Sequence, residues 1–104
     1  MTRDDIMNIL EMRFHKEMVD IYKKAKAECD YNATYFLQMV TKYGGVETAR
    51  RLLATQVPSE GFTKLWEYGR LDLTMEALVL KPEYTTLFSE GETRIARERL
   101  EQYK

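Results

Sequence analysis

The 104-residue sequence contains one cysteine, one histidine, two prolines and five glycines. Because Cys29 is the only thiol, the chain cannot form an internal disulfide, which argues against a secreted scaffold stabilised by disulfides. No stretch approaches the run of about 20 apolar residues that spans a membrane. The start of the sequence, MTRDDIMNIL, has acidic residues where a signal peptide needs basic ones. We therefore expect a cytoplasmic protein.

The sequence also lacks a strong net charge, because 16 basic and 17 acidic side chains give −1. No global field would therefore draw the molecule to nucleic acid or to an anionic membrane. His15 and Cys29 lie on one expected helix about 20 Å apart, too far to share a zinc ion. A nucleophilic triad would have to use His15, and no phosphate-binding motif occurs. The sequence predicts no metal, no cofactor and no enzymatic activity.

The composition of the chain favours α-helix. Scarce proline and glycine, with abundant strong helix formers, favour helix over sheet. From Asp4 to Cys29 apolar residues recur every three or four positions, which predicts one long amphipathic helix that Thr2 or Asp4 can cap. The residues of this stripe are Met7, Leu10, Phe14, Met18, Ile21, Ala25 and Cys29, with Ile6, Ile9 and Val19 widening it.

Shorter helices are expected in the rest of the chain. Their boundaries are marked by caps and glycines: Asn32, Gly44, Ser59, Gly69, and a capping box at Ser89 to Glu92. The stretch LDLTMEALVL begins with the alternation of a strand, but a lone strand would have no partner, so we expect a short helix capped by Asp72 or Thr74. The sequence predicts one all-α domain over residues 1–104, an irregular bundle of six or seven helices. Residues 1–30 form the long helix and residues 31–104 the compact body.

Residues 33–54 have the layout of a helix-turn-helix, in which TKYGG joins FLQMV to VETARRLL. Gly44 would end the first helix and Gly45 would permit the reversal. In this hypothesis Thr48, Arg50 and Arg51 contact phosphates or guanine, and Lys42 flanks the DNA backbone. Residues 31–70 carry five basic and three acidic side chains, a local charge of +2. Against the hypothesis, Glu47 would face phosphates, and a glycine break suits any helical hairpin.

Basic and aromatic side chains alternate in the next helix, where Lys64 and Arg70 flank Trp66 and Tyr68. Such a pattern can provide a stacking platform for single-stranded nucleic acid. The alternative is that Trp66 packs in the core, which we prefer because a small bundle needs large apolar side chains.

Three runs in the sequence, YNATYFLQMVTKYGGVETARRLL, GFTKLWEYGRLDLTMEALVL and PEYTTLF with RIARERL, carry a resemblance. Over residues 31–103 the chain resembles an uncharacterised small all-helical domain of bacteria, found alone or at the ends of longer proteins. The resemblance implies an autonomous helical module. It implies no activity and no catalytic residue.

The long first helix suggests how the protein works. Its apolar face runs for about 38 Å at 1.5 Å per residue, longer than the short helices behind it can cover. A free stripe of methionine and aliphatic side chains suits self-association or docking of another protein. We expect the contact to involve Met7, Leu10, Phe14, Met18 and Ile21. Full burial of the stripe is the alternative, and nucleic-acid binding is the rival function.

Overall fold

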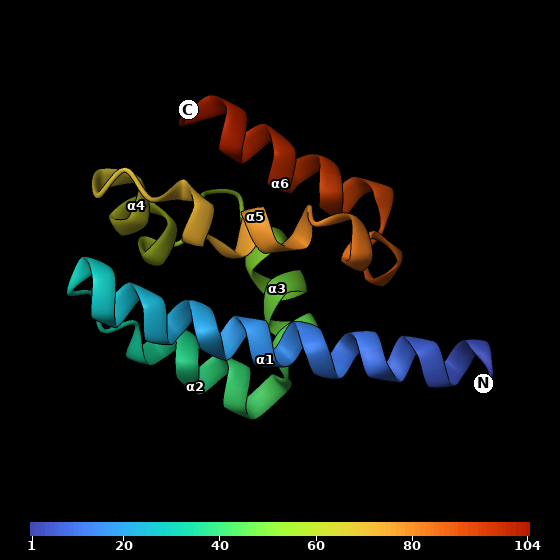
Figure 1. The fold of residues 1–104 in the computed structure, drawn as a ribbon. Coiled ribbons are helices and arrows are strands. Elements are labelled where there is room, and N and C mark those ends of the chain that lie inside the picture. The colour runs from blue at the N-terminus through green and yellow to red at the C-terminus, as the bar shows by residue number, and fades with distance from the viewer.

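The computed structural model describes residues 1–104, and every regular element in it is helical. Figure 1 shows the long helix α1 along one side, with α2 beside it and the remaining elements stacked across its other face. The six α-helices are α1 (Arg3–Cys29), α2 (Thr34–Tyr43), α3 (Gly45–Leu53), α4 (Glu60–Glu67), α5 (Met75–Val79) and α6 (Glu90–Gln102). Two short 3₁₀-helices, η1 (Leu71–Leu73) and η2 (Pro82–Leu87), flank α5. The predicted all-α bundle is confirmed, and no strand forms between Leu71 and Leu80.

Helix α1 begins with a reciprocal cap. The Thr2 hydroxyl accepts a hydrogen bond from the Asp5 amide, and the Asp5 carboxylate accepts one from the Thr2 amide. Such a capping box satisfies amides that the first helical turn leaves free. The helix ends at Cys29, followed by Asp30 in the left-handed conformation with φ of 51°. At its N-terminal end α1 extends past the other helices (Figure 1).

The α2–α3 corner turns on Gly44, which has φ of 85° and caps both helices. The end of α2 at this glycine is as predicted. Gly45 has a different role from the expected one: it is the first residue of α3, and a Cβ on it would lie 2.7 Å from the Cα of His15. Gly45 is therefore required for the close approach of α3 to α1 and not for the reversal of the chain.

The N-cap predicted at Asn32 is wrong. Helix α2 follows Ala33 without any side-chain cap. The Asn32 side chain instead accepts a hydrogen bond of 2.6 Å from the hydroxyl of Tyr22 on α1. A tertiary contact therefore uses the oxygen that would have capped the helix.

The caps predicted in the second half of the chain are confirmed. Side chains of Ser59, Thr74 and Ser89 accept hydrogen bonds from the first turns of α4, α5 and α6. Gly69, with φ of 70°, follows the end of α4, and its neighbour's amide bonds back to the Leu65 carbonyl as in a Schellman motif.

The main core lies where α1, α3, α5, η2 and α6 meet. Phe14 of α1 is at its centre and makes edge-to-face contacts with Tyr84 and Phe88, both at 5.2 Å between ring centroids. A smaller cluster at the other end of α1 contains Ala25, Cys29, Leu65 and Leu73. Core packing of Trp66 is not observed: its side chain is 44% exposed and rests edge-on against Tyr103.

Candidate functional site

The apolar stripe of α1 divides into a buried and an exposed part. Phe14 and Met18 are completely buried in the core, so the expectation that these two residues contact a partner is wrong. Met7, Leu10 and Ile21 are partly buried and pack against the same core. The five residues proposed for partner binding are thus mainly the inner face of the helix.

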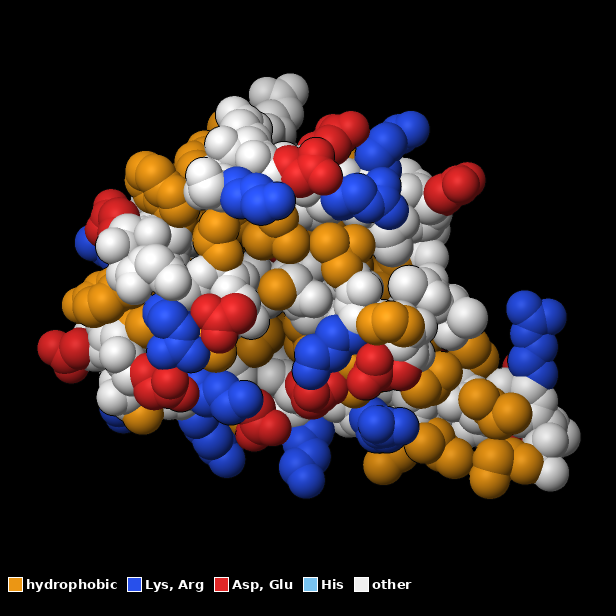
Figure 2. Space-filling view, turned by 45° about the horizontal axis from the view of Figure 1, so that its top comes forward, with side chains coloured by type: hydrophobic (Ala, Val, Ile, Leu, Met, Phe, Trp, Pro, Cys, Tyr) orange, Lys and Arg blue, Asp and Glu red, His pale blue; other side chains and the backbone are white.

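Other apolar residues near the start of α1 face the solvent. Ile6 is 48% exposed, Ile9 44% and Met12 72%. They belong to the first ten residues of α1, whose N-terminal end extends past the other helices, and Figure 2 shows hydrophobic side chains gathered at this end of the molecule. Their spacing of three residues runs obliquely across the helix, away from the core face.

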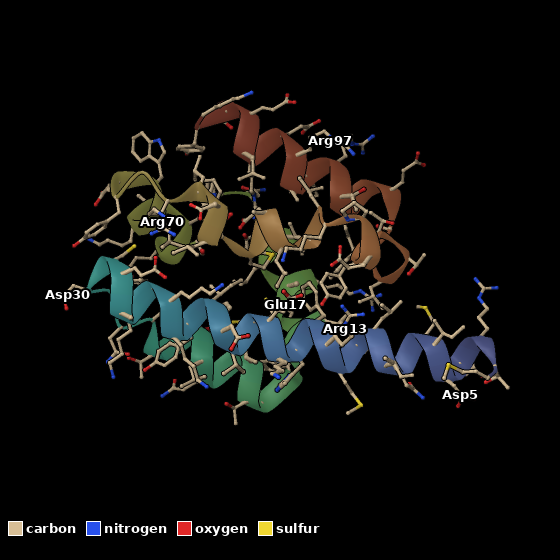
Figure 3. The ribbon with its side chains drawn as sticks, in the orientation of Figure 1. Asp5, Arg13, Glu17, Asp30, Arg70 and Arg97 are labelled. Atoms are coloured by element: carbon tan, nitrogen blue, oxygen red, sulfur yellow. The ribbon has the colours of Figure 1, made fainter.

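Charged side chains of both signs flank this exposed apolar face. Asp5 and Arg13 lie four positions before and after Ile9, and therefore one turn away from it on either side. Both residues are exposed and both are labelled in Figure 3. Arg13 takes part in none of the ion pairs of the chain. The hydrogen bonds from Thr2 lower the pKa of Asp5, so this carboxylate is charged at neutral pH.

The position of Thr48 argues against the helix-turn-helix hypothesis. This residue is completely buried, so the expectation that its hydroxyl contacts a phosphate or a base is wrong. Its hydroxyl oxygen has no hydrogen-bond partner, and the residue packs beside the buried Ala49 on the inner side of α3. The first turns of α3 therefore do not present the polar row that a recognition helix needs.

The basic residues of this hypothesis are exposed, but most are engaged within the chain. Arg50 donates a hydrogen bond of 2.7 Å to the Leu87 carbonyl and lies 3.8 Å from the Glu92 carboxylate. Arg51 pairs with Glu47 at 3.0 Å and lies over the ring of Tyr43. Lys42 also lies near the Tyr43 ring, and Lys64 pairs with Glu67 at 3.8 Å. These contacts give each basic residue a structural role.

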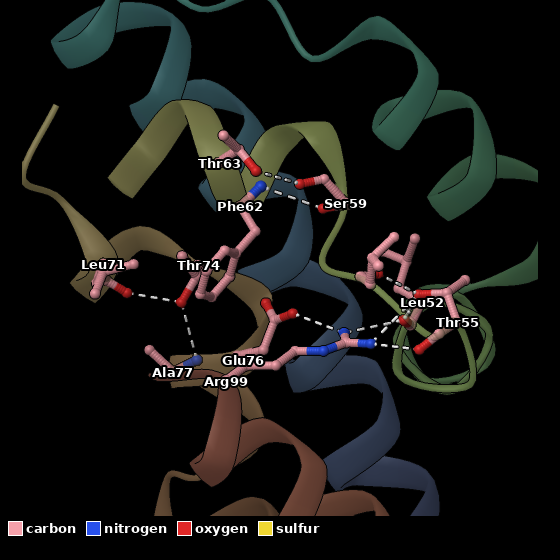
Figure 4. Close-up of polar contacts among 11 residues, drawn as sticks. Leu52, Thr55, Ser59, Phe62, Thr63, Leu71, Thr74, Glu76, Ala77 and Arg99 are labelled. Carbon is pink, nitrogen blue, oxygen red and sulfur yellow. Dashed lines mark hydrogen bonds and ion pairs between the residues drawn. The ribbon is translucent and has the colours of Figure 1, made fainter. Parts of the chain in front are cut away.

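A buried carboxylate pairs with an arginine beneath helix α4. Glu76 on α5 accepts a hydrogen bond of 3.1 Å from Arg99 on α6, and both side chains are buried. Arg99 also donates to the carbonyls of Leu52, in the last turn of α3, and of Thr55, just after that helix (Figure 4). Burial raises the pKa of Glu76, although Arg99 opposes that rise. The sequence analysis did not identify this pair, because its two members lie 23 positions apart and Arg99 stands among other charged residues.

A second polar contact, partly buried, joins α1 to η2. The Tyr84 hydroxyl donates a short hydrogen bond to Glu17, and Lys81 donates to the other carboxylate oxygen at 3.1 Å. Burial disfavours the charged form of Glu17, but these two donors outweigh it and lower the pKa. Burial and the neighbouring carboxylate raise the pKa of Tyr84 to about 12. Each carboxylate oxygen of Glu17 thus accepts a hydrogen bond, so the contact has a structural role in holding η2 against α1.

A cavity of about 410 Å³ opens between the C-terminal half of α1, helix α2, the end of α3 with the segment after it, helix α4 and the start of α5. Thirteen of its twenty lining residues are hydrophobic. The lining includes Glu76 together with Leu52 and Thr55, the three residues that Arg99 holds. A cavity of this size is within the range of small-molecule sites. No pattern in the sequence indicated it, because residues from five separate segments form its wall.

The structure contains no group of three or more side chains that could hold a metal ion. No helix combines the length and the hydrophobicity that a membrane crossing requires. His15 is partly buried, and its Nδ1 accepts a hydrogen bond from the Gly45 amide at 3.0 Å. This bond supplies a structural role for the only histidine.

No protein-family model matches the chain, and no curated protein or solved structure matches it. The resemblance of residues 31–103 to a small bacterial helical domain therefore stays a prediction.

Proposed function

We propose that the chain is a cytoplasmic, non-enzymatic protein-interaction module that binds a second copy of itself through the N-terminal part of α1. The observation that carries the proposal is the exposure of Ile6, Ile9 and Met12 on the side of α1 that does not pack against the core. Contiguous apolar side chains at the surface commonly mark sites of protein association. Methionine suits such a surface because its side chain adapts to the shape of a partner.

A second copy is the partner that the charges of this face favour. In an antiparallel pair of helices with the two-fold axis at Ile9, residues four before and four after the axis face each other. Asp5 of one copy then meets Arg13 of the other, and this contact occurs twice. In the same register Ile6 meets Met12 of the second copy. The face is therefore complementary to itself in both charge and hydrophobicity.

Nucleic-acid binding through residues 33–54 is the weaker alternative. Thr48 is buried, and Arg50 and Arg51 have acceptors within the chain. A test is duplex and single-strand binding at low and moderate salt, with Arg50→Ala and Arg51→Ala. Contacts to phosphates would give an affinity that falls as the salt concentration rises. We expect no such binding to duplex or single-stranded nucleic acid.

The self-association test is the molar mass in solution at several protein concentrations, measured by light scattering and sedimentation velocity. We expect the mass of the wild type to rise from 12.3 kDa toward twice that value. Ile9→Lys places two like charges at the axis and should keep the protein monomeric. Tyr68→Lys, at a residue 54% exposed on the far side of the fold from this face, is the matched control and should associate like the wild type. A wild type that stays at 12.3 kDa throughout, or an unaffected Ile9→Lys variant, would contradict the proposal.

A further inference from the structure

The cavity beside α4 has several aromatic residues in its lining. Five aromatic residues contribute to its wall: Tyr22, Tyr31, Tyr35, Phe36 and Phe62. They come from α1, from α2 with the segment before it, and from α4, so aromatic residues border the space on several sides. Aromatic faces carry partial negative charge and attract cations.

The charged residues of the lining all have the same sign. They are Glu60 and Glu76, and no lysine or arginine is among the twenty lining residues. Arg99 pairs with Glu76 at 3.1 Å from outside the cavity, so that carboxylate already has a cation. Glu60 is exposed and takes part in none of the ion pairs of the chain. Glu60 is therefore the one charged residue of the lining that has no ion-pair partner.

Glu60 lies beside an aromatic ring of the lining. Burial, with a further contribution from the charge of Glu60, raises the pKa of the Tyr31 hydroxyl. A Cβ on Gly61, the residue after Glu60, would lie 3.8 Å from the Tyr31 ring. A carboxylate and an aromatic ring at one edge of an apolar cavity form the combination that binds an ammonium group attached to a hydrocarbon.

The ordinary explanation of Glu60 is that an acidic residue in the first turn stabilises a helix. The chain itself provides a comparison for this explanation. Helix α6 begins with the same three residues as α4, because Ser89, Glu90 and Gly91 repeat Ser59, Glu60 and Gly61. Glu90 can have the same effect on its helix, but it does not line the cavity. Variants at the two sites therefore separate a ligand role from a helix role.

We propose that the cavity binds a small apolar cation, namely an amine whose hydrocarbon part packs among the aromatic and aliphatic side chains. Its ammonium group lies between Glu60 and the ring of Tyr31. This site is separate from the exposed face of Ile6, Ile9 and Met12, so it does not depend on self-association.

The test compares three ligands of similar shape: phenylbutylamine, phenylbutanol and phenylbutyrate. Binding to the full chain is measured by calorimetry and by shifts of the backbone amide signals of Tyr31, Phe36 and Phe62. We expect the amine to bind about three- to fivefold more tightly than the alcohol, as for a charge at a partly exposed site, and the carboxylate to bind most weakly. Equal binding of the three, preference for the carboxylate, or absence of binding would overturn the proposal.

Two pairs of variants locate the site. Glu60→Gln should abolish the preference for the amine over the alcohol, whereas Glu90→Gln should retain it. Gly61→Leu should block all three ligands by placing a side chain against Tyr31, whereas Gly91→Leu, with only the Ser89 hydroxyl within 4 Å of a new Cβ, should bind like the wild type. Both leucines also favour helix over glycine, so loss of binding would not reflect unfolding. An unchanged preference in Glu60→Gln, or retained binding in Gly61→Leu, would overturn the proposal.

Discussion

The amide of Gly45 donates a hydrogen bond to Nδ1 of His15, 3.0 Å away, and so joins the first turn of α3 to the middle of α1. The backbones of α1 and α3 approach so closely here that the Cα of His15 leaves no room for a Cβ on residue 45. A helix start normally leaves its first amides without partners in the helix. Here a side chain from another helix provides one.

Gly45→Ala should therefore destabilise the fold, even though alanine favours helix. The added Cβ would lie 2.7 Å from a backbone atom, which cannot rotate away as a side chain could. We expect a loss of about 1–3 kcal/mol in the free energy of unfolding, measured with urea. Gly91→Ala, at an uncrowded helical position, is the control and should leave stability unchanged or increase it. Equal stability of the two variants would show that α3 can shift away from α1 without cost.

Arg99→Ala should cost about 3–5 kcal/mol, because it leaves the buried carboxylate of Glu76 without a cation. The carbonyls of Leu52 and Thr55 lose their donor in the same variant. Replacing both Glu76 and Arg99 by leucine should cost less than Arg99→Ala alone, since no unpaired charge remains. Arg97→Ala, at an exposed position of the same helix, is the control.

The pH dependence of Arg99→Ala follows from the direction of the Glu76 shift. Burial places the pKa of Glu76 above the ordinary value of 4.5, and loss of Arg99 should raise it further. A raised carboxyl pKa contributes stability that is present below 4.5 and lost as the pH rises. The destabilisation should therefore shrink as the pH is lowered toward that value. A cost independent of pH would indicate lost packing as its main cause.

Tyr84→Phe should lower stability most at neutral pH and less at both extremes. On the acid side, the lowered pKa of Glu17 gives a contribution that is lost as the pH falls below its ordinary value of 4.5. On the alkaline side, the tyrosine pKa is raised from 10.0 to about 12, so its contribution is lost as the pH rises through that range. We expect a neutral-pH cost of about 1–3 kcal/mol, because one oxygen of the Glu17 carboxylate loses its donor while the other keeps Lys81. Urea unfolding across pH checks this, with Tyr103→Phe as the control.

Arg13→Glu should weaken self-association more than it weakens the fold, where it replaces only an attraction to Glu17 one turn away. In the antiparallel arrangement the new carboxylate faces Asp5 of the second copy, so two attractive contacts become repulsive. We expect the dimer dissociation constant to rise by about tenfold at low salt and by less at high salt. Arg97→Glu makes the same charge change on α6, outside the proposed interface (Figure 3), and should leave association unchanged. If both variants behave alike, net charge and not a specific contact governs association.

Local features of the fold were predictable from the sequence, and features that depend on tertiary packing were not. The caps at Ser59, Thr74 and Ser89 were predicted because a cap involves residues within one turn of each other. The Asn32 cap failed because Tyr22, ten positions away, takes up its side-chain oxygen. Glycine at position 45 was recognised as meaningful, but its reason lies in His15, thirty residues earlier.

The candidate sites follow the same division. An apolar stripe on α1 too long to be fully covered was expected, but the pattern could not separate Phe14, which is buried, from Ile9, which is exposed. Arg99 had a weak signal, because it lies three residues after the buried Ala96 on the inner side of α6. The cavity had none, since it exists only where α1, α2 and α4 come together.

The bonds of Arg99 have a further consequence for local opening of the structure. One guanidinium on α6 holds Glu76, Leu52 and Thr55, and all three residues are part of the cavity wall. Detachment of α6 would therefore release this wall, so the helix and the cavity form one cooperative unit in the sense of hydrogen exchange. Any ligand that binds only the ordered wall must also slow the exchange of amides in α6, at a distance from the ligand and without touching that helix.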